Sequence, residues 1–296
     1  LETSKVLSAL ASSEEVRELA KRIRTGKAKE LRADGLCGSS VALLLASIMN
    51  GRGNNPNMLV VMNDMDDAGY LYHDLTQMMG DERVLFFPSS YRRAIKYNQK
   101  DAGNEILRMQ TLSQTLTHHG EGSHAESFPT TNTPDGSPHH GGDVRQDREG
   151  LLIVTYPDAL AERVVSKQEL DENMLTVKVG DEFDINQLEK DIFKLGFERV
   201  DYVYEPGQFA VRGSIVDVYS FSSDMPYRID FFGDEVDSIR TFDVQSQLSQ
   251  SKVDAMTIVP NIKKDNTEYI SFLEFLPKDT LIVTQSFAFV CDKIAQ

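Results

Sequence analysis

A glycine- and serine-rich loop ahead of a long apolar run is the first place where this sequence could do chemistry. Phosphate-binding loops read G-x-x-x-x-G-K-[ST], in which the lysine contacts the outer phosphates and the hydroxyl ligates Mg²⁺. When that pattern is laid from Gly35, Ser40 takes the place of the second glycine, and Val41 and Ala42 take the places of the lysine and the hydroxyl. We therefore expect a degenerate nucleotide loop that does not hydrolyse ATP, although amides at a helix start could still attract an adventitious anion. The residues of this loop are Gly35, Gly38, Ser39, Ser40, Val41 and Ala42.

Two acidic clusters and one cysteine are the other candidates for catalysis or metal binding. They are Asp64, Asp66 and Asp67 after an apolar strand, Asp234, Glu235 and Asp237 around a later turn, and Cys37 within the loop. A chain with 46 acidic residues produces such clusters by chance, and helix capping and turn formation account for them. A lone cysteine beside a buried helix is expected to pack rather than to react. We therefore predict no catalytic residue and no metal site.

Arginines and an aromatic residue on a group of closely spaced strands form a different kind of candidate site. Exposed arginines beside aromatic side chains are typical of protein-binding hot spots. The opposing interpretation is that each arginine simply pairs with a neighbouring acid, and composition by itself favours that interpretation. The residues concerned are Arg199, Phe209, Arg212, Arg228 and Asp230.

The elements that must position these residues follow two patterns. In the first half, continuous apolar strands alternate with amphipathic helices, which is typical of a parallel sheet covered on both faces. The strands are expected at 58–62, 84–87 and 151–154, and the helices at 12–24, 66–79 and 104–116. After residue 165, one helix capped by Asp184 is followed by short strands, which predicts an antiparallel meander in a small α+β domain. These strands are expected at 209–212, 214–219, 227–232 and 236–242, with a last apolar strand at 280–283.

The patterns divide the chain into three parts of an α/β protein. We expect a degenerate P-loop NTPase-like domain at 1–165, an α+β domain at 166–245, and an adjoining domain or a return to the first at 246–296. Residues 117–150 hold few large apolar side chains, so we expect a flexible insertion there. Its histidines are irregularly spaced and predict no metal site; they are His118, His119, His124, His139 and His140. Because the chain begins without Met and stops inside an apolar stretch, we expect a piece of a longer protein.

Charge and composition exclude several classes of protein. The net charge of the 296 residues is −15, and a chain this acidic is a poor binder of nucleic acid or of a membrane surface by itself. Residues 1–150 hold 17 basic and 20 acidic side chains, whereas residues 151–296 hold 14 and 26, so arginines in the second half stand out. Two cysteines make no disulfide framework, and no signal peptide or membrane-spanning run is visible. A cytoplasmic location is the simplest expectation.

One stretch of the sequence resembles a known family. The run from Phe209 through Asp243, with Arg212-Gly213 and the pattern R-x-D-F-F-G-D-E-x-D-S-x-R at 228–240, resembles the signature shared by excinuclease B and the N-terminal region of bacterial transcription-repair coupling factor. Excinuclease B keeps the Gly-Lys-Thr of its phosphate-binding loop, whereas the coupling factor's module resembles a copy that has lost it. The degenerate loop therefore favours the coupling-factor module.

The resemblance implies a function that the residues alone leave open. In the family the inserted domain binds excinuclease A, and Arg212, Arg228 and Asp230 match its contact positions, with Arg199 and Phe209 in the same segment. Ala210 replaces an arginine that excinuclease B often has. The resemblance implies no enzyme activity and no cofactor for this chain, because the ATP- and Mg²⁺-dependent motor and the contacts with RNA polymerase and DNA lie in other parts of the parent. The alternative is a nucleotide-dependent DNA-processing enzyme related to excinuclease B.

Overall fold

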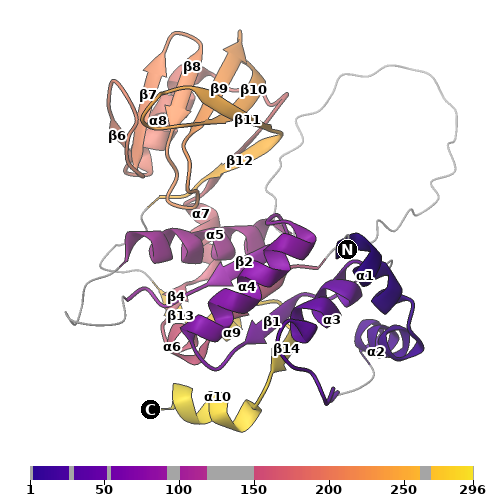
Figure 1. Cartoon of the computed structure of the whole chain (residues 1–296). Helices are drawn as coiled ribbons and strands as arrows, with labels where there is room; N and C mark the ends of the chain where they lie inside the picture. The colour runs from indigo at the N-terminus through magenta and orange to yellow at the C-terminus, as the bar shows by residue number, and fades with distance from the viewer. Residues whose placement is uncertain are drawn as a thin grey trace, which may run out of the picture.

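The chain forms an α/β unit built on a parallel sheet and a smaller α+β unit built on antiparallel strands (Figure 1). The computed structural model describes residues 3–26, 30–51, 55–91, 101–118, 150–260 and 268–295. Each unit has its own hydrophobic core, the larger around the parallel sheet and the smaller between the antiparallel strands and one helix. Among the described residues, no helix is both long enough and apolar enough to cross a membrane.

The parallel sheet has four strands in the order β14-β1-β3-β2. β1 and β3 are buried along their whole length, as their unbroken apolar sequences predict, because both faces of a central parallel strand are covered. The neighbouring strand β14 comes from more than a hundred residues further along the chain and pairs with β1 in parallel. The bounds are β1 Met58–Val61, β2 Val84–Phe87, β3 Leu152–Thr155 and β14 Leu281–Thr284.

Helices surround this sheet, and short polar residues set where they begin. The helix expected at 12–24 is present as Glu14–Thr25, and it begins where the Ser13 hydroxyl accepts a hydrogen bond from Val16 N at 3.3 Å. A further helix, Thr3–Ala11, precedes it and was not expected. Asp64 caps the next long helix by accepting from the backbone N–H groups of Asp66 and Asp67. The helices are α1 Thr3–Ala11, α2 Glu14–Thr25, α3 Ser40–Met49, α4 Met65–Met79, α5 Ala102–His118, α6 Pro157–Leu160, α7 Lys167–Glu172, α9 Phe272–Phe275 and α10 Phe287–Ile294, with a short pair β4 Val164–Val165 and β13 Tyr269–Ile270.

The α+β unit contains a six-stranded sheet in the order β11-β10-β9-β8-β7-β6. All its pairs are antiparallel except β6 with β7, and the two-stranded pair β5–β12 accompanies it. Asp184 caps the one helix of this unit, α8, as its sequence predicts, by accepting from the N–H groups of Asn186 and Gln187 at 2.8 and 3.3 Å. The bounds are β5 Leu175–Lys178, α8 Ile185–Lys194, β6 Glu198–Arg199, β7 Gln208–Arg212, β8 Ile215–Val218, β9 Tyr227–Phe232, β10 Glu235–Phe242, β11 Ser249–Val253 and β12 Ala255–Ile258.

The boundaries expected at 165 and 245 do not coincide with these units. α7 lies after residue 165, yet its Leu170 is fully buried in the core of the parallel-sheet unit. β11 and β12 lie after residue 245, yet they pair with β10 and β5 of the α+β unit. The strands need those partners for their backbone hydrogen bonds, so the α+β unit runs from β5 to β12. Of the expected insertion at 117–150, residues 117 and 118 complete α5 and residues 119–149 lie outside the described residues.

The cap of α8 can be tested by mutation. We expect Asp184→Ala to lower the free energy of unfolding by about 1 kcal/mol, because two N–H groups at the helix start lose their acceptor. Asp184→Asn keeps an acceptor oxygen and should cost clearly less. Denaturant unfolding followed by circular dichroism measures both variants, and equal losses would contradict the capping role.

Candidate functional site

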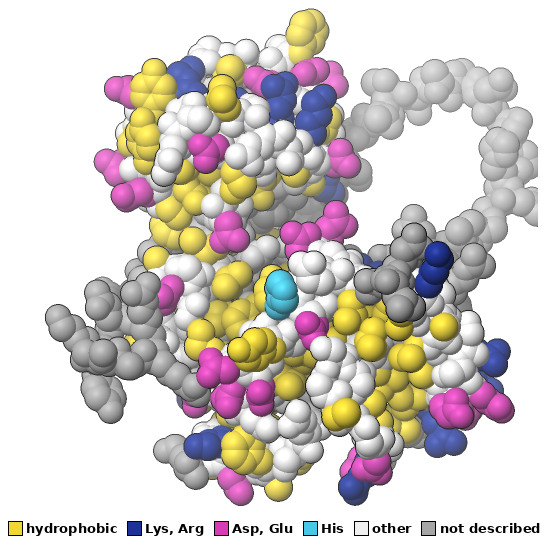
Figure 2. Space-filling view, in the orientation of Figure 1, with side chains coloured by type: hydrophobic (Ala, Val, Ile, Leu, Met, Phe, Trp, Pro, Cys, Tyr) yellow, Lys and Arg dark blue, Asp and Glu magenta, His cyan; other side chains and the backbone are white. Residues whose placement is uncertain are grey.

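The outer side of the six-stranded sheet carries most of the predicted site. Alternate residues of a strand point to opposite sides, and the side that packs against α8 is apolar. The register places five charged residues of four neighbouring strands together on the other side. We call this group the arginine face; it comprises Arg212 on β7, Asp217 on β8, Arg228 and Asp230 on β9, and Arg240 on β10. Figure 2 shows lysine and arginine side chains beside acidic ones on the α+β unit.

Asp217 lies at the centre of the arginine face and is fully buried. Its Oδ1 accepts a hydrogen bond from Arg228 Nε at 2.8 Å, and its Oδ2 accepts one from Arg228 Nη2 at 2.9 Å. Arg212 donates to the same Oδ2 through its Nη2. One carboxylate is thus shared by two guanidinium groups, and these charge-assisted hydrogen bonds compensate it for the loss of water.

Arg228 is held by contacts on several sides. Its guanidinium lies over the Phe242 ring at 4.6 Å, and its Nη1 donates to the backbone oxygen of Gln247 at 3.2 Å. Its side chain is only 15% exposed. The hydrogen bonds to Asp217 raise the pKa of Arg228 above its ordinary value, so this side chain stays charged. Arg228 is therefore part of the frame of the face and offers little surface to a partner.

Arg240 and Asp230 form the second pair of the face. Arg240 Nη2 lies 3.1 Å from Asp230 Oδ2 and 3.0 Å from the Ser238 hydroxyl, to which it donates. Arg240 is directly opposite Arg228 across the two strands, a placement that would be repulsive without the two aspartates. The side chains of Arg240 and Asp230 are 35% and 24% exposed, so both are accessible to a partner.

The segment between β6 and β7 lies against this side of the sheet. Val203 packs there with Ala210 and Phe242 in a small third core. Arg212 Nη1 donates to the backbone oxygen of Asp201 at 2.9 Å, and its guanidinium lies 5.2 Å from the Tyr202 ring. Ala210 is 1% exposed, so Val203 and Phe242 cover the position where the resemblance implies an arginine in excinuclease B.

Two of the predicted contact residues lie elsewhere. Phe209 is fully buried in the core on the α8 side of the sheet, so its prediction as a contact is wrong. The side chain of Arg199 also turns to that side, where its Nη1 lies 2.5 Å from Glu189 Oε1 on α8. Strand alternation separates these residues from the arginine face, because the parallel register puts Arg199 beside Phe209.

Sequence reasoning missed Asp217, Arg240 and Tyr202. A usable signal existed for the first of them, because Asp217 is the one charged residue in the apolar strand β8. A charge in such a strand is rarely buried without a partner. Arg240 is the last residue of the pattern at 228–240, so the resemblance also offered a signal for it, whereas nothing singles out Tyr202.

The loop at Gly35 is the second predicted site, and it lacks the lysine and the hydroxyl of a phosphate-binding loop. Gly35 and Gly38 adopt positive φ angles of 82° and 53° and turn the chain into α3. The Ser40 hydroxyl accepts a hydrogen bond from Cys37 N at 2.7 Å, so it already serves the loop itself. Val41 packs against the core and Ala42 is fully buried. The described residues 30–38 contain no strand before the loop, so the P-loop-like assignment is not confirmed. Cys37 is exposed, so the expectation that it packs is wrong.

A polar network at the carboxyl ends of β2 and β3 was also not foreseen. Arg108 is 6% exposed, donates to the backbone oxygen of Pro88 at 2.7 Å and lies 4.1 Å above the Phe87 ring. Glu162 Oε1 accepts a hydrogen bond from the backbone N–H of Ser90, and Glu162 Oε2 lies 3.5 Å from Arg108 Nη1. Burial lowers the pKa of Arg108 from its ordinary value. All these groups hold the chain after β2, so the network is structural.

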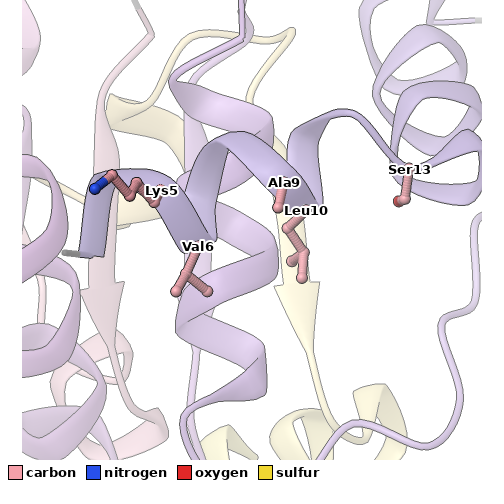
Figure 3. A pocket seen from close by; sticks show the side chains of 5 residues that line it. All are labelled: Lys5, Val6, Ala9, Leu10 and Ser13. Atoms are coloured by element: carbon pink, nitrogen blue, oxygen red, sulfur yellow. The ribbon is translucent and has the colours of Figure 1, made fainter. Parts of the chain in front are cut away.

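No other part of the described chain provides a chemical site. The described residues contain no group of three or more His, Cys, Asp or Glu side chains that could hold a metal ion. A shallow depression at α1 is lined by Lys5, Val6, Ala9, Leu10 and Ser13 (Figure 3). Its walls are almost entirely apolar and bring no acid–base pair together. The sequence also has a small basic and aromatic cluster, Arg92, Arg93, Lys96 and Tyr97, which lies outside the described residues.

Mutation can compare Arg228, which holds the buried Asp217, with Arg199, which lies on the α8 side of the sheet. We expect Arg228→Ala to lower the free energy of unfolding by about 3 kcal/mol, because a fully buried carboxylate loses its bidentate partner. Arg199→Ala removes a pair whose arginine is 56% exposed and should cost about 1 kcal/mol or less. Denaturant titrations of both variants measure the difference, and equal losses would refute the assignment of Arg228 to the frame.

Comparison with known proteins places the α+β unit in a known domain family. Residues 175–263 match the model of the UvrB interaction domain, a span that contains all the strands of the α+β unit. The chain is 37% identical over 237 residues to the transcription-repair-coupling factor of Escherichia coli, which covers 79% of this chain and 18% of that protein. It is 38% identical over 117 residues to the Haemophilus influenzae factor, covering 40% of this chain and 10% of the relative. The Bacillus subtilis factor is 27% identical over 254 residues, covering 85% and 18%.

The chain spans only about a tenth to a fifth of the length of these relatives. The matches nevertheless cover both of its units, and the domain match lies on the sheet that carries the arginine face. Over the part that it spans, this chain belongs to the transcription-repair-coupling factor family.

Proposed function

We propose that this chain is a recruitment module that binds excinuclease A through the arginine face and so links transcription to nucleotide excision repair. The observation that carries the proposal is the buried Asp217, which holds Arg212 and Arg228 side by side on the sheet that matches the UvrB interaction domain. An ordered charged cluster of this kind is unusual on a surface that only needs to be soluble. It suits a surface that must meet one partner in a fixed orientation.

The chemistry of the face fits a contact between proteins. Arg212 and Arg240 are each 35% exposed, so they keep part of their guanidinium surface for a partner. Arginine suits such contacts because its planar group is weakly hydrated and makes several directed hydrogen bonds. Asp230 adds an accessible acceptor beside Arg240. Arg199 lies at the β6 edge and would take part only if the partner reached around that edge.

Arg212→Gln tests the proposed contact. A glutamate at this position would place a second carboxylate beside the buried Asp217 and would disturb folding, whereas glutamine removes the charge and leaves Asp217 paired with Arg228. We expect the Kd for excinuclease A to rise by about 30-fold, which corresponds to roughly 2 kcal/mol for an arginine anchor.

Lys194→Gln is the matched control, because Lys194 is an exposed cation on α8, on the opposite side of the sheet. Isothermal titration calorimetry on the 296-residue chain measures both variants. An unchanged Kd for Arg212→Gln, in a variant with a native circular dichroism spectrum, would refute the proposed contact.

We also propose that this chain hydrolyses no nucleotide and needs no cofactor, and that the ATP-dependent translocase activity and the contacts with RNA polymerase and DNA belong to other parts of the parent protein. The support is chemical: Val41 and Ala42 supply neither the lysine nor the Mg²⁺-binding hydroxyl of a phosphate loop. We expect no ATP turnover above background with or without DNA. A Mg²⁺-dependent turnover that disappears when residues 35–42 are changed would establish the enzyme alternative instead.

A further inference from the structure

Asp217 cannot contact a partner directly, because its side chain is fully buried beneath the arginine face. Its two oxygens accept three hydrogen bonds from Arg212 and Arg228. A buried carboxylate is costly unless it is paired in this way, so its place in the strand needs an explanation beyond packing. The neighbours of Asp217 in β8, Val216 and Val218, belong to the core on the other side of the sheet.

The arrangement brings like charges together. Arg212 and Arg228 both approach the same Oδ2 atom of Asp217, and Arg240 is opposite Arg228 on the next strand. Without a shared carboxylate, Arg212 and Arg228 would repel each other and take separate rotamers towards water. The other contacts that hold the Arg212 guanidinium are the Asp201 backbone oxygen and the Tyr202 ring.

The donors are used unequally by the two arginines. Arg228 uses Nε, Nη1 and Nη2 within the chain, whereas the hydrogen bonds of Arg212 to the described residues involve Nη1 and Nη2 only. The Arg212 side chain is 35% exposed, and its Nε–H makes no hydrogen bond to the described residues, so a donor of this guanidinium remains for a partner. A guanidinium edge with free N–H groups recognises a carboxylate through directed, charge-assisted hydrogen bonds.

We infer that Asp217 is a positioning residue of the arginine face, which fixes Arg212 so that its outer edge can donate hydrogen bonds to a carboxylate of the partner. The inference rests on the proposed function, because it names how the same face is held and what chemistry it meets. Asp217 acts through Arg212 and touches no partner atom. Arg228 serves as the second support, since its two hydrogen bonds hold the Asp217 carboxylate in place.

The first measurement needs neither a partner nor a variant. In nitrogen-15 spectra of the wild-type chain, the Nε–H of Arg228 should exchange with water far more slowly than the Nε–H of Arg212, because only the former is hydrogen-bonded to the buried Asp217. Equal, fast exchange at both sites would overturn the inference, whatever happens to folding in any variant.

The second measurement is a binding cycle with excinuclease A. Asp217→Asn keeps the shape of the side chain but removes the charge shared by the two arginines, and we expect the Kd to rise by about tenfold or more. In the Arg212→Gln background the same substitution should change the Kd by less than about threefold, because the residue that it positions is gone. Asp237→Asn is the matched control, since Asp237 is an exposed aspartate on β10.

The outcomes of the cycle distinguish the positioning role of Asp217 from the proposed binding function. If Arg212→Gln weakens binding and Asp217→Asn does not, the positioning role is overturned while the proposed function stands. If Asp217→Asn weakens binding equally in both backgrounds, Asp217 does not act through Arg212 and the inference is again overturned. If Arg212→Gln leaves the Kd unchanged, the proposed function and this inference are overturned together.

Discussion

A single buried carboxylate holds the outer side of the α+β unit together. Asp217 pairs with both Arg212 and Arg228 and reduces their mutual repulsion, and Asp230 pairs with Arg240 on the neighbouring strand. The rest of the face depends on this pairing, because three arginines on one side of the same sheet repel one another. The small Ala210 opposite Asp217 leaves room for Val203 to cover the sheet, and that cover brings Tyr202 and the Asp201 backbone to Arg212.

The larger unit provides the scaffold from which the α+β unit is presented. The chain leaves the parallel sheet after β3 and, beyond the α+β unit, returns as β14 to pair with β1. Both connections of the α+β unit therefore lead back to the parallel-sheet unit (Figure 1). The network of Arg108 and Glu162 fastens the chain at the ends of β2 and β3, where related α/β folds often place a ligand.

The local charge of the arginine face differs from the net charge of the chain. Residues 151–296 have 26 acidic and 14 basic side chains, yet the arginine face has three arginines against two aspartates. The arginine face is therefore a small cationic patch on an acidic unit, and the net charge of the chain does not reveal it. Electrostatic complementarity depends on where the charges lie and not on their sum.

The sequence by itself determined the type of the longer elements of both units. Unbroken apolar runs identified the strands of the parallel sheet and Asp184 identified the start of α8, because these signals are local and depend on neighbouring residues. Composition also favoured arginines that pair with acids, and the structure has such pairs. The tertiary structure decided which side of the sheet each residue occupies. It places Phe209 in the core and Arg199 beside α8, and it pairs both Arg212 and Arg228 with Asp217. It also assigned β11 and β12 to the α+β unit and β14 to the parallel sheet. Such pairings depend on strand register and on contacts between distant residues, which no local pattern in the sequence specifies.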